Sequence, residues 1–441
     1  MSTDAHGRTE VPRTLEEAPP PRLLGLFDQM ALWWNLGISL LLLVAATFVV
    51  EPFGVPRLSL AAALTAVLVG SVLGNLLLGL AAVPGAETGA PGMVLLRGLL
   101  GRRGSWVPTA CNVLQLVGWT TFEIVVIAES ATELTSSGWR WVFVVGAGVL
   151  ATLMALRPLG VVRGYLKRIA VWVVLASTVY LFIQVLRQPL DRIDGGSWTG
   201  FWKGADLVIA LSVSWIPLAA DYSRHSTDNR SAFLGAFLGY GAASMVFFTL
   251  GVLAYAAYGG DDVIGSLLAI PAGGVALVIL IIDELDEVFA DLYSTVVSVQ
   301  NLDPRLDRRV LAVMVGALAT MLALALDIHS YEKFLLLLGS VFVPLFGTFA
   351  TDYFLVSRRV WDVSDDARPR WDMLVPWALG FVAYQLVNPG SVEWWANWWI
   401  DLGFEAPSWA SASLVSLAVA VVATLAVGAV TRRMRSTAAR P

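Results

Sequence analysis

Five carboxylates lie within nine residues of this 441-residue chain, directly after an apolar run at 275–282. At about 100° per residue they cover roughly half of a helix's circumference, so they would share one face. Ionisable side chains at bilayer depth are costly and normally face a cavity, a partner or a substrate. Whether this segment lies at bilayer depth therefore decides whether its carboxylates form a functional site. The five residues are Asp283, Glu284, Asp286, Glu287 and Asp291.

A second polar stripe consists of Asn112, Gln115, Trp119 and Glu123, at spacings of three and four residues. Such residues stack along one face of a helix. One interpretation is a polar seam between packed helices, where amides are common, with the tryptophan serving packing. Glu123 favours a functional face instead, because a carboxylate packs poorly in a membrane.

Two apolar segments contain residues that interrupt a helix. Residues 210–217 read ALSVSWIP, and the proline removes a backbone donor inside the apolar run. In transporters such breaks line cavities, whereas elsewhere a simple proline kink is the competing interpretation. Asn35, Gly37 and Ser39 form a weaker break early in the chain. Breaks placed alike in two halves suggest an inverted repeat, with spans one to five matching six to ten.

The composition identifies a polytopic membrane protein. Hydrophobic residues make up 57% of the chain and charged residues 14%, against about a quarter charged in a soluble protein. The single Cys111 excludes an intramolecular disulfide. Residues 1–26 are polar and Pro-rich, which predicts a disordered cytoplasmic tail rather than a signal peptide.

Apolar runs predict twelve membrane spans. With the amino terminus in the cytoplasm, 23 of the 29 Lys and Arg residues fall in cytoplasmic segments, which supports an even number of spans and two cytoplasmic termini. The spans are expected near 28–50, 58–83, 107–132, 139–156, 166–186, 202–220, 232–257, 274–299, 309–326, 333–356, 373–388 and 409–431.

Residues that start a helix before the acidic run indicate how deep in the membrane the run lies. Pro271, Gly273 and Gly274 precede a helix. A helix that starts there needs about 20 residues to cross the membrane, so positions 283–291 would lie near the middle. The alternative is a span that ends at Ile282, followed by an amphipathic helix at 283–299 on the cytoplasmic surface.

Four segments carry a recognisable pattern: GNLLLGLAAVPGAETGAPGMVLLR at 74–97, the Gly118-Trp119 pair, AADYSRHS at 219–226 and TDYFLVSRR at 351–359. Together they resemble the first nucleobase:cation symporter family, which includes the cytosine permeases. The agreement runs in order across spans two to ten. The resemblance implies an all-α membrane protein of about twelve helices, with a five-plus-five inverted repeat, broken helices one and six, and a leucine-transporter-type fold. The repeats would cover 27–190 and 191–360, with helices eleven and twelve at 361–441.

The resemblance also implies site residues. Trp119 would stack on a flat heterocycle, and Glu123 one turn later would accept hydrogen bonds from it. In helix six the family's aromatic position falls at Ser212, whereas the nearest aromatic residue is Trp215. In helix eight the family's substrate-contacting amide falls at Ala290 or Asp291, and its sodium-ligating hydroxyls fall near Leu285 and Asp286. Acids that replace neutral groups there would ligate sodium or carry a coupled proton, because five close carboxylates cannot all stay ionised in a dry site.

The sequence thus predicts a secondary active permease for a nucleobase such as cytosine or a purine, or a related heterocycle, in the cell's inner membrane. It is not expected to be an enzyme, to use a cofactor, to bind nucleic acid or to bind a metal other than sodium; the coupling ion is a proton or sodium. A monomer is the working expectation. The alternatives are an amino-acid or vitamin-precursor carrier of the same fold, a passive channel and a membrane scaffold. The predicted substrate residues are Trp119, Glu123, Gln115, Ser212, Trp215 and Asp291, and the predicted coupling residues are Asp286, Glu287, Gly37 and Ser39.

Overall fold

The computed structural model describes residues 21–156, 171–193, 195–260, 263–326, 331–390, 392–404, 406–407 and 409–438, and within them every regular element is a helix. Helices, either single or interrupted, are found at all twelve predicted spans, and the start of the fifth span at 166–170 lies outside the described residues. The first half holds α1 (Leu26–Asn35), α2 (Leu40–Val50), α3 (Leu60–Thr88), α4 (Gly92–Gly104), α5 (Trp106–Thr135), α6 (Arg140–Ala155) and α8 (Val171–Leu186).

The second half repeats the pattern of long apolar helices with short connecting ones. It holds α9 (Phe201–Ser214), α10 (Ile216–Ser223), α11 (Asn229–Leu234), η2 (Gly235–Tyr240), α12 (Gly241–Tyr258), α13 (Val263–Leu268), α14 (Gly273–Leu302), α15 (Arg308–Ala325), α16 (Tyr331–Ala350) and η4 (Thr351–Val356). After it come η5 (Trp371–Met373), α17 (Leu374–Val387), α18 (Glu393–Ile400) and α19 (Ala412–Ala438). Among the described residues, seven helices are long and apolar enough to cross a membrane, and the bent pair α1 and α2 makes an eighth.

The first span is broken, as predicted. Helices α1 and α2 meet at 66° across the four residues between them. Gly37 lies in this break against Ala243 and the carbonyl of Tyr240, where a Cβ atom would collide with both. Ser39 caps α2 by accepting a hydrogen bond from the Leu41 amide at 3.1 Å. The break is therefore built by a close backbone approach and a new helix start.

The sixth span is interrupted more mildly than the first. Trp215, between α9 and α10, keeps helical dihedral angles, and Phe201–Ser223 remains one apolar span. Pro217 follows within the first turn of α10, where its missing amide costs no hydrogen bond. The chain thus interrupts its ladder of backbone hydrogen bonds here without a sharp turn.

Helix α14 resolves the depth of the acidic run. It begins at Gly273, after Ala272 in the left-handed region at φ 55°, and continues to Leu302. It packs along α5 and also against α6, α8 and α15. All five carboxylates of the run are buried, with 1–5% of each side chain exposed. The alternative of a surface helix at 283–299 is therefore wrong.

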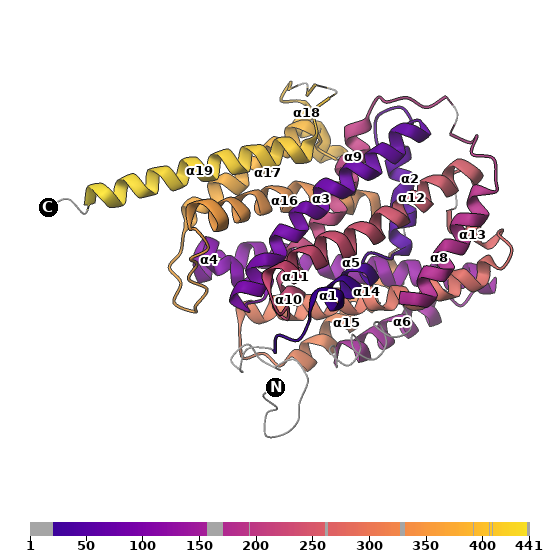
Figure 1. Ribbon diagram of the computed structural model, residues 1–441, viewed down its shortest axis with the longest axis horizontal. Coiled ribbons are helices and arrows are strands. Elements are labelled where there is room, and N and C mark those ends of the chain that lie inside the picture. The colour runs from indigo at the N-terminus through magenta and orange to yellow at the C-terminus, as the bar shows by residue number, and fades with distance from the viewer. Residues whose placement is uncertain are drawn as a thin grey trace, which may run out of the picture.

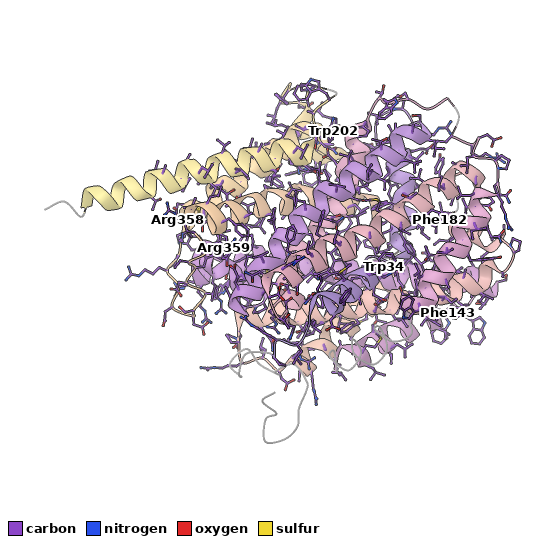
Figure 2. All side chains as sticks on the ribbon, in the orientation of Figure 1. Trp34, Phe143, Phe182, Trp202, Arg358 and Arg359 are labelled. Atoms are coloured by element: carbon purple, nitrogen blue, oxygen red, sulfur yellow. The ribbon has the colours of Figure 1, made fainter. Side chains whose placement is uncertain are left out.

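Figure 1 shows the helices gathered into one bundle, with α19 running past α17 and projecting beyond it. One end of this bundle, here called the basic end, carries α4 and the segment 357–370. Ion pairs close it: Arg370 donates twice to Asp352 at 2.7 and 2.9 Å, and Arg359 pairs with Glu87 at 2.7 Å. Arg358 and Arg359 are labelled at this end in Figure 2.

Two acids near this end, Asp221 and Asp352, have structural roles in the fold. Asp221 caps α4 by accepting from the Gly92 amide at 2.8 Å, and Asp352 pairs with Arg370 rather than with the nearer Arg358. Residues 1–20 of the predicted tail lie outside the described residues. Its last part is held in place, because the amides of Leu23 and Leu24 both donate to the His225 carbonyl at 2.9 Å.

Candidate functional site

A small enclosed cavity lies where the interrupted spans meet α5 and α14. Its walls come from α2, α5, α9, α10, η2, α14 and α16. Its volume is about 10 Å³, close to what a single water molecule requires. The walls must therefore move apart before a heterocycle fits between them.

Aromatic side chains close the cavity toward the end opposite the basic end. Trp119 of α5 meets Tyr331 and Phe334 of α16 edge to face, with ring centroids 5.8 and 5.3 Å apart. Because α16 leads into the basic end through η4, its first residues lie toward the opposite side. Phe122 adds contacts to Tyr331 and Phe334 at 5.6 and 5.4 Å.

A second aromatic group closes the cavity toward the basic end. Trp33 of α1 is fully buried and contacts Trp215 and Tyr222 with centroids 6.1 and 5.9 Å apart. Trp215 also contacts Tyr240 at 5.5 Å and shares a side-chain hydrogen bond with it. The cavity is thus covered by rings on both sides, with one set from α5 and α16 and the other from α1, η2 and the interruption between α9 and α10.

Three carboxyl groups face this cavity: Glu123 from α5, and Glu287 and Asp291 from α14. Glu123 and Asp291 share a hydrogen bond across the two helices, which requires a proton between them. The other oxygen of Glu123, Oε2, is buried and has no partner among the described residues. The packing of α5 along α14 brings these acids together.

The remaining acids of α14 contact the break in the first span. Asn35 Nδ2 donates to Asp283 Oδ1 at 3.3 Å and also to Asp286 Oδ2. Glu284 accepts from Ser39 Oγ at 2.9 Å and from the Leu40 amide at 2.7 Å. Its carboxylate therefore satisfies a free amide at the start of α2, where the helix dipole favours negative charge.

The predicted site residues separate into two groups. Six line the cavity: Trp119, Glu123, Trp215, Asp291, Glu287 and Ser39. Four do not. Gln115 donates to Asn112 and to the Ser214 carbonyl, Ser212 lies against Gly74, Asp286 is bound to Asn35, and Gly37 lies in the break. Glu287, predicted beside the coupling ion, is placed on the cavity instead.

Sequence reasoning missed two tyrosines on the lining, Tyr240 and Tyr331. Tyr331 precedes the span predicted at 333–356 and is fully buried, with its hydroxyl unpartnered among the described residues. Tyr240 ends the π-helical turn η2, whose wider winding has no signal in hydropathy. The one signal in the sequence was that both residues are aromatic, which is typical of a cavity that holds a ring.

The loop after α10 holds a buried histidine outside the spans. His225 is 4% exposed and lies beside Pro21, whose carbonyl is 3.4 Å from Nδ1. Burial, followed by the neighbouring Arg224 charge, lowers the pKa of His225 from 6.5 to about 3. The ring is therefore neutral at physiological pH and joins the N-terminal segment to this loop.

Comparisons with known proteins agree with this architecture. A family described as permeases for cytosine/purines, uracil, thiamine and allantoin matches residues 21–370. Cytosine permeases of Escherichia coli K12 and O157:H7 are each 25% identical over 335 residues, which cover 71% of this chain and 76% of theirs.

Among solved structures, the nucleobase-cation-symport-1 transporter Mhp1, closed with bromovinylhydantoin bound, matches with a TM-score of 0.74 at 17% identity, over 96% of each chain. Its inward-facing conformation gives 0.69 at 16% identity, over 96% of this chain and 94% of that one. MhsT in complex with L-phenylalanine gives 0.55 at 14% identity, over 91% and 96%. The fold is therefore shared with Mhp1 and, at a lower score, with MhsT, and between the two Mhp1 structures the higher score belongs to the closed form.

Proposed function

The chain belongs to the family of permeases for cytosine and purines, uracil, thiamine and allantoin, and on that premise we propose that it carries a flat heterocycle through the cell's inner membrane, coupled to protons. One observation supports this most: the occluded cavity is lined by aromatic side chains together with buried carboxyl groups at the meeting point of two interrupted spans. Aromatic faces cover a ring, and a few polar groups at its edge fix its orientation.

The two aromatic closures support alternating access. Tyr331 and Phe334 cover Trp119 on one side, and Trp33 and Trp215 cover the other. Parting one set at a time would open the cavity to one side of the membrane while the other side stays shut. The ion pairs of the basic end, Asp352 with Arg370 among them, would hold the cytoplasmic side closed if both termini are cytoplasmic, as the distribution of basic residues favours.

Coupling to protons rests on the acids at the break in the first span. Asp283 and Asp286 share the single side-chain amide of Asn35, and the ion pairs of the described residues lie elsewhere, toward the ends of the helices. Two adjacent buried carboxylates without a cation are strongly unfavourable, so at least one of them holds a proton in this state. We propose that release and uptake of that proton, with Asp286 as the main site, drives the cycle.

The test is uptake by the purified full-length protein in proteoliposomes. Labelled cytosine, adenine and a hydantoin are offered with an inward proton gradient, an inward sodium gradient, or neither. Accumulation above equilibrium under the proton gradient alone supports the proposal. Accumulation under sodium alone would assign the coupling to sodium, and uptake that never exceeds equilibrium would indicate a channel.

A matched pair of variants tests the coupling residue. Asp286→Asn should still exchange labelled for unlabelled substrate but lose its response to the proton gradient. Glu129→Gln, an acid-to-amide change on α5 beside Arg140 at the partly exposed end of that helix, serves as the control. Unaltered proton dependence in Asp286→Asn would exclude Asp286 as the coupling site.

A further inference from the structure

The wall of the substrate cavity is acidic on two sides. Glu123, Glu287 and Asp291 are 1%, 5% and 2% exposed, and all three line the cavity. None of the described lining residues is Lys, Arg or His. A neutral ring in this cavity would leave any ionised carboxylate there without a counter-charge, which is costly at low dielectric.

The polar groups of the lining offer acceptors more than donors. Ser214 Oγ already donates to the Leu211 carbonyl at 2.7 Å, and Ser39 Oγ donates to Glu284 at 2.9 Å. Glu123 Oε2 is buried and has no hydrogen-bond partner in the part of the chain that the structure describes. Of the lining hydroxyls, that of Tyr331 is without a partner among the described residues. A ligand with several N–H groups at its edge satisfies this set, whereas a carbonyl-rich edge faces carboxyl oxygens.

The charge of the cavity can be bounded from its contacts. The hydrogen bond between Glu123 and Asp291 needs at least one proton, so that pair carries at most one negative charge, and Glu287 adds a second when it is ionised. The titratable neighbours that pack behind the wall are Glu284 and Asp286 on α14, Tyr240 on η2 and Tyr331 on α16, and none supplies positive charge. The cavity therefore holds at most two negative charges, and a positively charged ring is the ligand that would stabilise its carboxyl groups in the ionised form.

The aromatic lining is suited to a cation as well. Trp119, Trp215, Tyr240 and Tyr331 come from four different elements and surround the same cavity. The faces of such rings attract a cation within about 6 Å of their centroids, and more strongly when water is excluded. Aromatic walls with carboxylates among them bind a positively charged ring better than a neutral one.

We propose that the heterocycle carried by this protein is cationic when bound: an amino-substituted ring that is protonated or quaternised, with N–H donors directed at Glu123, Glu287 and Asp291. This inference rests on the proposed function and narrows it. A neutral pyrimidine or purine would then be a weak ligand of the same cavity.

Binding of matched probes to the purified full-length protein tests the charge of the substrate. The cationic probe is 1-methyl-2,4-diaminopyrimidinium, and the neutral probes of similar shape are cytosine and uracil, all measured by calorimetric titration at pH 7. We expect the cation to bind at least tenfold more tightly than either neutral ring. Equal or tighter binding of cytosine or uracil overturns the inference and leaves the transport proposal standing.

Two acid-to-amide variants separate a local effect from the general charge of the protein. Glu287→Gln keeps the shape of the side chain and should reduce the preference for the cation at least tenfold, with little change in affinity for uracil. Glu129→Gln lies outside the cavity and should retain the full preference. If both variants still prefer the cationic ring to the neutral ones, Glu287 does not determine the preference for charge and the inference fails. If no ring of either charge binds or is taken up by the unmodified protein, the proposed function fails first.

Discussion

Glu284 holds the start of α2, and removing its charge should weaken the fold measurably. The carboxylate is 1% exposed, and each of its oxygens accepts one hydrogen bond, from Ser39 Oγ and from the Leu40 amide. In Glu284→Gln one oxygen becomes an NH₂ group that cannot accept, so one charge-assisted bond of about 2 kcal/mol is lost. The other bond becomes neutral and loses about 1 kcal/mol. We expect a total destabilisation of about 3 kcal/mol.

Thermal unfolding of the purified protein in detergent measures this loss against two further variants. Ser39→Ala removes the hydroxyl that donates to Glu284 and accepts from the Leu41 amide, and it should cost about 2.5 kcal/mol. Because both side chains belong to one network, the double variant should fall short of the sum of the two losses by about 1 kcal/mol. Glu129→Gln, with 26% of its side chain exposed, controls for the loss of an acid. Equal midpoints for Glu284→Gln and Glu129→Gln would refute the assignment of Glu284 as the cap of α2.

Three further predictions concern the ring site, the basic end and the loop after α10. Trp119→Ala should weaken substrate binding roughly 5- to 150-fold, the equivalent of about 1–3 kcal/mol of stacking, and titration calorimetry with Trp119→Phe as the milder control will show it. Asp352→Asn should cost about 2 kcal/mol in unfolding, less than for a fully buried pair because Arg370 is 28% exposed, whereas Arg359→Gln at the more exposed pair should cost under about 1 kcal/mol. His225 has a pKa of about 3 in the folded protein against 6.5 in the unfolded chain, so its contribution to stability is complete above pH 6.5 and is lost as the pH falls toward 3. At pH 5 the free energy of unfolding should be about 2 kcal/mol lower than at pH 8. His225→Asn should remove that part of the pH dependence.

Local patterns predicted the spans and the depth of the acidic run, because hydropathy and helix punctuation are properties of short segments. Pro271 and the glycines after it mark the start of α14, and the run falls in its middle for that reason. The contact between Glu123 and Asp291 could not be predicted from local patterns. It depends on the register of α5 along α14, which packing of many side chains sets and which no local pattern in either helix records.

The same distinction explains the residues that were misplaced. Gln115 and Ser212 lie on the expected faces of their helices, yet Gln115 is used to hold the Ser214 carbonyl and Ser212 packs where α9 approaches α3 at Gly74. Tyr331 lies just outside its predicted span because a tyrosine beside charged residues reads as a loop. Its burial comes from α16 folding over Trp119, which is a tertiary event.

One rigid helix links the two acidic groups. On α14 the stripe Glu284, Glu287 and Asp291 follows spacings of three and four, and Asp283 with Asp286 forms the neighbouring stripe. The first stripe runs from the start of α2 to the substrate cavity, and the second faces Asn35 at the end of α1. A proton gained on either stripe changes the charge of the carboxyl groups that hydrogen-bond to the break in the first span. A charged ring in the cavity lies about one helical turn away and changes the electrostatic energy of the same carboxyl groups. We therefore expect binding of the proton and of the substrate to be coupled through charges on a single element, and linkage then requires each to change the affinity of the other by the same factor.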